Sequence, residues 1–104
     1  MKIKFICNAS RWFDKASGNI YHSVKITRVK DGKQIAAPLQ YGYEDHYRQT
    51  ALKLMLENKW IKYSGLPGGY MIETLHLYER ENNYPISWNV TDGLKRDCIA
   101  NGII

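Results

Sequence analysis

The most constraining feature of this chain is the alternation of apolar and polar residues from Ile20 to Thr27. Successive side chains of a strand point to opposite faces, so the alternation predicts a half-buried β-strand. The pair Asp31-Gly32 follows and favours a type I′ turn, in which both central residues have positive φ. The chain is therefore expected to return antiparallel through residues 34–37. Pro38 cannot donate a ladder hydrogen bond, so that strand ends there or lies at a sheet edge.

A second alternation, in which Ile3, Phe5 and Cys7 are the apolar residues, predicts another strand near the start of the chain. An amphipathic helix is expected after the hairpin, because its apolar residues recur at helical spacing. The residues of that stripe are Tyr47, Ala51, Leu54 and Met55, and Leu52 and Leu56 widen it. Leu54 and Met55 are expected to be buried, and Arg48 and Lys53 to be exposed.

The remaining segments are less regular. Residues 70–81 fit either a helix or a strand, and the scarcity of β-branched residues favours a helix. Residues 86–90 predict a short strand, and residues 94–100 a last helix that Asn101-Gly102 ends. The expected fold is one α+β domain spanning residues 1–104. It has an antiparallel three-stranded sheet, a packed amphipathic helix and further short helical elements.

The charge and composition of the chain indicate which kinds of partner it can bind. The 104 residues carry 15 Lys plus Arg against 10 Asp plus Glu, a formal net charge of +5 that favours polyanionic partners. No apolar stretch reaches membrane-spanning length, so no membrane partner is expected. Cys7 and Cys98 are isolated thiols in a chain without a secretory signal pattern, which predicts reduced cysteines and a cytoplasmic location.

Two clusters combine rings with fixed positive charge: residues 11–15 and residues 41–48. Rings can stack on bases and cations can hold phosphates, so we expect a site for nucleic acid or a nucleotide. The candidate ligand-binding residues are Arg11, Trp12, Lys15, Tyr41, Tyr43 and Arg48. The alternative interpretation is that the rings fill the core and the charges face solvent.

Several short stretches carry a resemblance to a known group of proteins. They are Arg11-Trp12-Phe13-Asp14-Lys15, Gln40-Tyr41-Gly42-Tyr43, Glu81-Asn82-Asn83-Tyr84-Pro85, Trp88-Asn89-Val90 and Lys95-Arg96-Asp97. With them, most of the chain resembles small uncharacterised proteins of tailed bacteriophages and prophages. That group has no agreed activity to carry over. The resemblance implies a protein made inside an infected cell, where such proteins often bind nucleic acid or disable a host system.

No catalytic constellation is visible in the sequence. The three histidines lie far apart, and His22 is expected on the buried face of its strand. The spacings typical of zinc sites and the converging carboxylates of metal-dependent nucleases are missing, so no metal or cofactor is expected. The sequence therefore predicts a non-catalytic binding protein for nucleic acid or a nucleotide. The alternative is a protein-binding inhibitor of a host defence factor.

Overall fold

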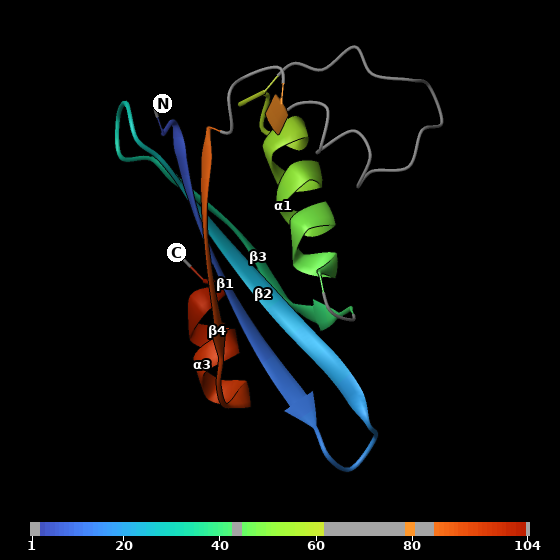
Figure 1. The fold of residues 1–104 in the computed structure, drawn as a ribbon. Helices are drawn as coiled ribbons and strands as arrows, with labels where there is room; N and C mark the ends of the chain where they lie inside the picture. Colours follow the sequence, from blue (N-terminus) through green and yellow to red (C-terminus); the bar gives the residue numbers. More distant parts are fainter. Residues whose placement is uncertain (1–2, 43–44, 62–78, 81–84, 104) are drawn as a thin grey trace.

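The computed structural model describes residues 3–42, 45–61, 79–80 and 85–103. The elements are β1 (Phe5–Asp14), β2 (Asn19–Arg28), β3 (Gln34–Tyr41), α1 (His46–Glu57), β4 (Ile86–Asp92) and α3 (Lys95–Asn101). The four strands form one sheet in the order β3-β2-β1-β4. Helix α1 lies on one face of this sheet and α3 on the other, so the described chain is α+β (Figure 1).

The sheet differs from the expected one in strand number and direction. Strands β1, β2 and β3 are antiparallel, but β4 adds a fourth strand that runs parallel to β1, from Phe5↔Ile86 to Arg11↔Asp92. The prediction of three antiparallel strands was therefore wrong in this respect. A parallel pair needs a long connection, and the segment between β3 and β4, which contains α1, provides it.

Strand β1 is longer than the alternation at its start suggested. It pairs with β2 without interruption from Phe5↔Arg28 to Asp14↔Asn19. The first aromatic–basic cluster therefore lies mostly inside a strand, where neighbouring side chains point to opposite faces. Cys7 and Ala9 are buried on the α1 side.

The β2–β3 turn occurs where the sequence predicted it, but it is not type I′. Gly32 has φ +72°, whereas Asp31 is not among the residues with positive φ. The loop is closed by hydrogen bonds from the Arg28 N–H to the Lys33 carbonyl and from the Gly32 N–H to the Arg28 carbonyl, both 2.8 Å long. The Asp31 carboxylate also accepts a hydrogen bond from the Lys33 N–H. Pro38 lies within β3, which is an edge strand as expected.

The core lies between α1 and the sheet. Leu52 and Met55 are fully buried in it, together with Val24 and Ile26 of β2. Tyr47, Ala51 and Met55 of the predicted stripe are buried as expected, whereas Leu54 is only partly buried against the core. Helix α1 also turns Thr50 toward the sheet, where it is buried beside β2.

Helix α3 ends as predicted, with Gly102 as its C-cap. A Cβ on Gly102 would lie 2.8 Å from Pro38 Cα and 2.9 Å from the Ala37 carbonyl oxygen, so a glycine lets α3 approach the backbone of β3. Cys98 is the buried side chain of this helix. Of the segment 70–81, only Glu79 and Arg80 are described, and both are helical. The rest of that prediction lies outside the described residues.

Replacing Gly32 with valine should lower the free energy of unfolding by about 1–2 kcal/mol, because a β-branched residue resists positive φ. No other atom lies within 4 Å of the added Cβ, so the loss would come from backbone strain rather than from a clash. Gly32→Asn is the matched control, since asparagine tolerates this conformation. Denaturant unfolding should rank glycine above asparagine and asparagine above valine; a valine variant as stable as the parent would contradict the turn geometry.

Leu52→Ala should cost about 2–5 kcal/mol in chemical denaturation, because its side chain is fully buried. Leu54→Ala removes the same atoms from a partly buried position on the same helix, so its cost should be nearer 1 kcal/mol. Equal losses, or a larger loss at Leu54, would show that α1 presents another face to the sheet.

Candidate functional site

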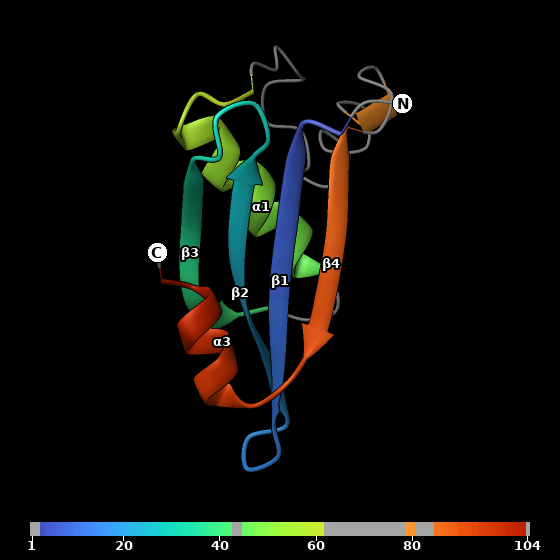
Figure 2. The same ribbon diagram turned by 90° about the vertical axis from the view of Figure 1, so that its left-hand side faces the viewer.

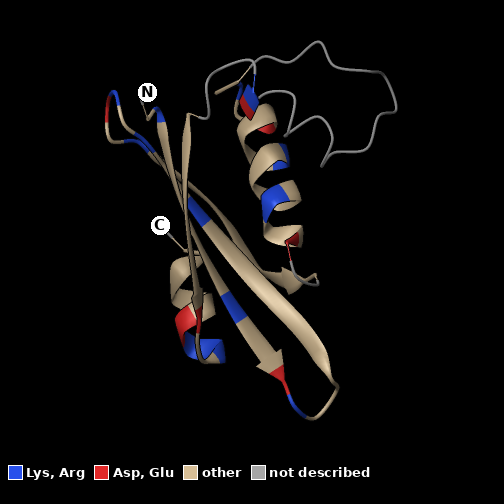
Figure 3. Cartoon of the chain, viewed as in Figure 1, with Lys and Arg blue, Asp and Glu red and all other residues tan. Residues whose placement is uncertain are grey.

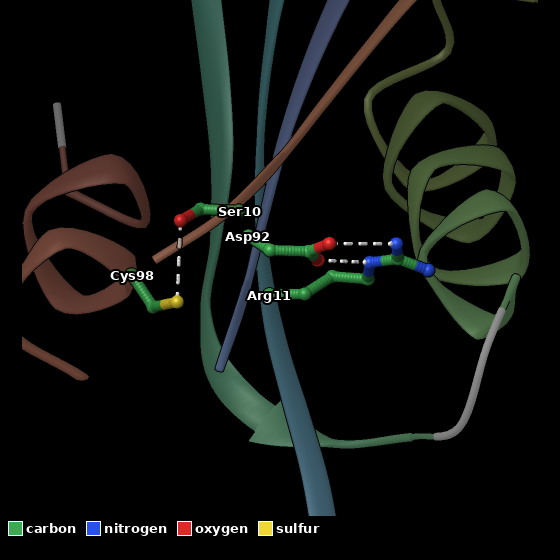
Figure 4. A network of polar contacts seen from close by, with 4 residues as sticks. All are labelled: Ser10, Arg11, Asp92 and Cys98. Carbon is green, nitrogen blue, oxygen red and sulfur yellow. Dashed lines mark hydrogen bonds and ion pairs between the residues drawn. The ribbon is translucent and has the colours of Figure 1, made fainter. Parts of the chain in front are cut away.

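Arg11 lies on the α1 side of the sheet and forms an ion pair with Asp92 at the end of β4. Its Nε donates to Asp92 Oδ1 at 2.8 Å and its Nη2 to Oδ2 at 3.4 Å. Figure 4 shows this pair pointing toward α1, whereas the neighbouring Ser10 points to Cys98 of α3, with Oγ and Sγ 3.2 Å apart. Much of the positive charge of Arg11 is therefore balanced by a partner from β4.

Trp12 follows Arg11 in β1 and so faces the α3 side. Its ring lies 5.4 Å from that of Tyr21, and the Tyr21 ring lies 6.0 Å from that of Tyr41. The Lys95 Nζ sits 5.5 Å above the Trp12 ring. Trp12 and Tyr41 are thus brought together in one row across three strands, but on the face opposite Arg11.

Three of the predicted site residues share a groove. Lys15 is exposed in the β1–β2 turn and lines a groove of about 790 Å³ that Arg11 and Trp12 also line. Arg48 is half-buried on α1, and its guanidinium carbon lies 5.0 Å from the centre of the Trp88 ring. Tyr43 lies outside the described residues. The structure therefore brings Arg11, Trp12 and Lys15 to one groove, whereas Tyr41 and Arg48 are not among its lining residues.

The structure assembles a different aromatic–basic cluster at the other end of the sheet. An open groove of about 450 Å³ lies among the start of β1, the β2–β3 turn and the segment that follows α1. We call it the basic groove. Its lining residues are Ile3, Lys4, Phe5, Arg28, Val29, Lys30, Lys59 and Trp60. Four of the eight are cations and none is acidic.

The C-terminal end of α1 positions Lys59 at the basic groove. The Lys59 N–H donates to the Leu56 carbonyl at 3.1 Å, and the Trp60 N–H donates to the Met55 carbonyl at 2.9 Å. This is the hydrogen-bond pattern of a Schellman motif, which usually has glycine at the left-handed position. Here that position is Lys59, with φ 58°. A lysine therefore occupies a position at which the backbone conformation favours glycine.

Trp60 holds the basic groove together. Its ring stacks on Phe5, with the centroids 6.0 Å apart, and the Arg28 guanidinium carbon lies 4.7 Å from the centre of the Trp60 ring. Arg28 also donates two hydrogen bonds to the Asp31 carboxylate, at 3.0 and 2.6 Å. Those hydrogen bonds are the main reason that the pKa of Asp31 falls to about 2. Asp31 thus acts mainly as the partner of Arg28.

The lysines of the basic groove are available to an anion. Among the described residues, no ion pair is found for Lys4, Lys30 or Lys59. Figure 3 shows Lys and Arg at the β2–β3 turn and at the start of β1, close to one another at the same end of the molecule. The negative end of the α1 dipole is nearby, and a helix dipole typically changes the free energy of a nearby charge by about 0.3–1 kcal/mol. Backbone or side-chain donors also cap three of its last carbonyls.

The groups best suited to catalysis are buried. His22, 1% exposed, has its Nε2 2.7 Å from Thr50 Oγ1, and its ring centre lies 5.4 Å from that of His46. A Cβ on Gly42 would lie 2.6 Å from His22 Cε1, so these rings leave little room. Burial raises the pKa of the Cys7 thiol to about 12. Within the described ranges, no three His, Cys, Asp or Glu residues gather to hold a metal ion.

Comparison with known proteins does not assign the chain to a family. No family model matches the chain, and neither a curated protein nor a solved structure matches it. The resemblance to small phage proteins therefore stays a prediction. None of the helices in the described part of the chain is long and apolar enough to cross a membrane.

The sequence contained only part of the signal for the basic groove. Lys30 flanks the predicted turn and Lys4 the predicted first strand, so both were visible as cations next to recognisable elements. Lys59 and Trp60 were visible only as the end of a helix. Their approach to Lys4 depends on the angle at which α1 crosses the sheet, which no local pattern encodes.

The buried His22 should make stability depend on pH. Burial, and then the nearby His46, lower its pKa from 6.5 to about 4, so the folded protein favours the neutral ring. An unfolded chain binds a proton near pH 6.5, and the stabilisation is complete above that pH. This stabilisation is lost as the pH falls from 6.5 toward 4. The total loss is up to about 3 kcal/mol, because each pH unit between the two pKa values contributes about 1.36 kcal/mol.

Urea unfolding measured at intervals between pH 7 and pH 4 tests this expectation. The free energy of unfolding should fall across that range in the parent protein, and the fall should be smaller in a His22→Gln variant, whatever its absolute stability. A parent protein whose stability is flat from pH 6.5 to pH 4 would contradict the burial of His22.

Proposed function

We propose that this protein is a non-catalytic binding protein that recognises nucleic acid through the phosphates of its backbone. The observation that carries the proposal is the basic groove, which Lys4, Lys30 and Lys59 line together with Arg28 and without an acidic residue. Phosphate contacts supply most of the affinity of non-specific nucleic-acid binding. A net charge of +5 supports the same partner, because it attracts polyanions over long distances.

The burial of the reactive side chains supports the proposal that the protein is non-catalytic. Cys7 and Cys98 are both buried, and burial raises the pKa of each thiol, which disfavours the nucleophilic thiolate at neutral pH. His22 is enclosed between α1 and the sheet. The basic groove offers cations and rings, which suit binding.

Salt dependence tests the proposal. Fluorescence anisotropy with a labelled single-stranded oligonucleotide should give a plot of log affinity against log salt with a slope of about −2 to −3. That is the value for three or four phosphate contacts at roughly 0.7 each. Lys30→Gln should make the slope shallower by about 0.7. Lys53→Gln, which removes a cation paired with Glu57 on α1, is the control and should change little. The proposal fails if no oligonucleotide binds, or if the two variants have equal slopes.

Lys59→Gly separates binding from folding. Glycine adopts the left-handed conformation without the cost to a larger residue, so this variant should be as stable as the parent or more stable by about 0.5–1 kcal/mol. It should nevertheless bind the oligonucleotide more weakly, because one of the groove cations is gone. A variant that is stabilised and binds as tightly as the parent would remove Lys59 from the interface.

A protein partner is the second candidate, as in the inhibitor of a host factor that the sequence left open. Phe13 and Leu94 are each 55% exposed and both line the groove beside Arg11 and Asp92. Exposed apolar residues rimmed by charges are typical of protein interfaces. A Phe13→Ser/Leu94→Ser variant discriminates the two functions: it should retain oligonucleotide binding under the first and lose its protein partner under the second.

A further inference from the structure

We propose that the sheet face beside α3 extends the basic groove and binds unpaired nucleotides, so that the ligand is single-stranded. This inference rests on the proposed function and names the form of nucleic acid. On the α3 side of the sheet, two rows of side chains run from β4 to β3 beyond the end that α3 covers. We call these two rows the open face. The polar residues of the open face are Asn8, Lys25, Thr27, Gln34, Ser87 and Asn89.

Burial distinguishes the open face from the part under α3. Ser10 and Ser23, one row farther along β1 and β2, are buried against Cys98 of α3. Asn8 and Lys25 are register partners in the next row, and neither is buried. Figure 2 shows the same division, with α3 in front of the lower part of the sheet and the upper part uncovered on this side. Within the part of the chain that the structure describes, the polar residues of the open face are therefore exposed or partly exposed on all four strands.

The open face is continuous with the basic groove through Lys4. Phe5 lines the basic groove and points to the α1 side. Lys4 directly precedes β1 and also lines the basic groove, so the groove begins next to Ile6 and Thr27 in the first row of the open face. The charge of the open face is also complementary to a nucleic acid, because Lys25 stands near its centre and none of its polar residues is acidic. A strand with a phosphate at Lys4 can therefore continue across this face.

The chemistry of the open face matches unpaired nucleotides better than a duplex. Its amides and hydroxyls can donate to and accept from base edges and sugars, and Gln34 already donates to Thr27 at 3.1 Å. In a duplex those base edges lie inside grooves. A four-stranded face is too broad to enter such a groove, whereas a single strand can lay its splayed bases on it.

Anisotropy titrations with one sequence as single-stranded DNA, single-stranded RNA and duplex DNA test the inference. We expect the single strands to bind at least 10-fold more tightly than the duplex. Lys25→Gln should weaken single-strand binding 3-fold to 10-fold and leave duplex binding within 2-fold. Lys53→Gln on α1 is the matched control for loss of one charge, and Lys25→Arg, which keeps the charge, should retain most of the affinity. The difference between the DNA and RNA arms reports whether the sugar hydroxyl is read.

The outcomes separate this inference from the proposed function. If Lys30→Gln and Lys59→Gly weaken binding while Lys25→Gln behaves like Lys53→Gln, the open face is not an interface and the basic groove remains one. Duplex binding as tight as single-strand binding overturns the inference in the same way. If none of the three nucleic acids binds, the proposed function falls and the inference falls with it.

Discussion

The stacking of Trp60 on Phe5 is the contact on which the rest of the proposed interface depends. It fixes the end of α1 over the start of β1, and it places Trp60 beside Arg28, the register partner of Phe5 on β2. A hydrogen bond of 2.9 Å from the Val29 N–H to the Lys4 carbonyl joins the β2–β3 turn to the same point. Three separate segments thereby contribute lysines to the lining of one groove.

Strand alternation sends neighbouring side chains of the first aromatic–basic cluster to opposite faces of the sheet, although the end of β1 keeps Arg11, Trp12 and Lys15 at one groove. Arg11 and Trp12 are adjacent in the sequence, but the pleat of β1 sends them to opposite faces. Arg11 then pairs with Asp92 from β4, and Trp12 joins Tyr21 and Lys95. Two residues adjacent in a strand therefore contact different partners, and those partners come from segments that are far apart along the chain.

Much of the fold could be predicted because its signals are local. The alternation of apolar and polar residues predicts β2. Single glycines mark the β2–β3 turn and the end of α3, because the backbone requires a small residue at both positions. The parallel pairing of β4 could not be predicted, since it depends on where a long connection returns. The apolar stripe of α1 was predicted, but the burial of Thr50 was not, because a polar residue there depends on its partner His22 in β2.

Amide chemical shifts in a labelled protein titrated with a single-stranded oligonucleotide test the central claim most directly. If the basic groove binds the phosphate backbone, the largest changes should occur at Val29, Lys30, Lys59 and Trp60, and they should weaken as salt is added. The turn at residues 15–18, at the opposite end of β1, serves as an internal control and should change little. The largest changes at Arg11–Lys15 and Asp92–Leu94, with none around Trp60, would contradict the account.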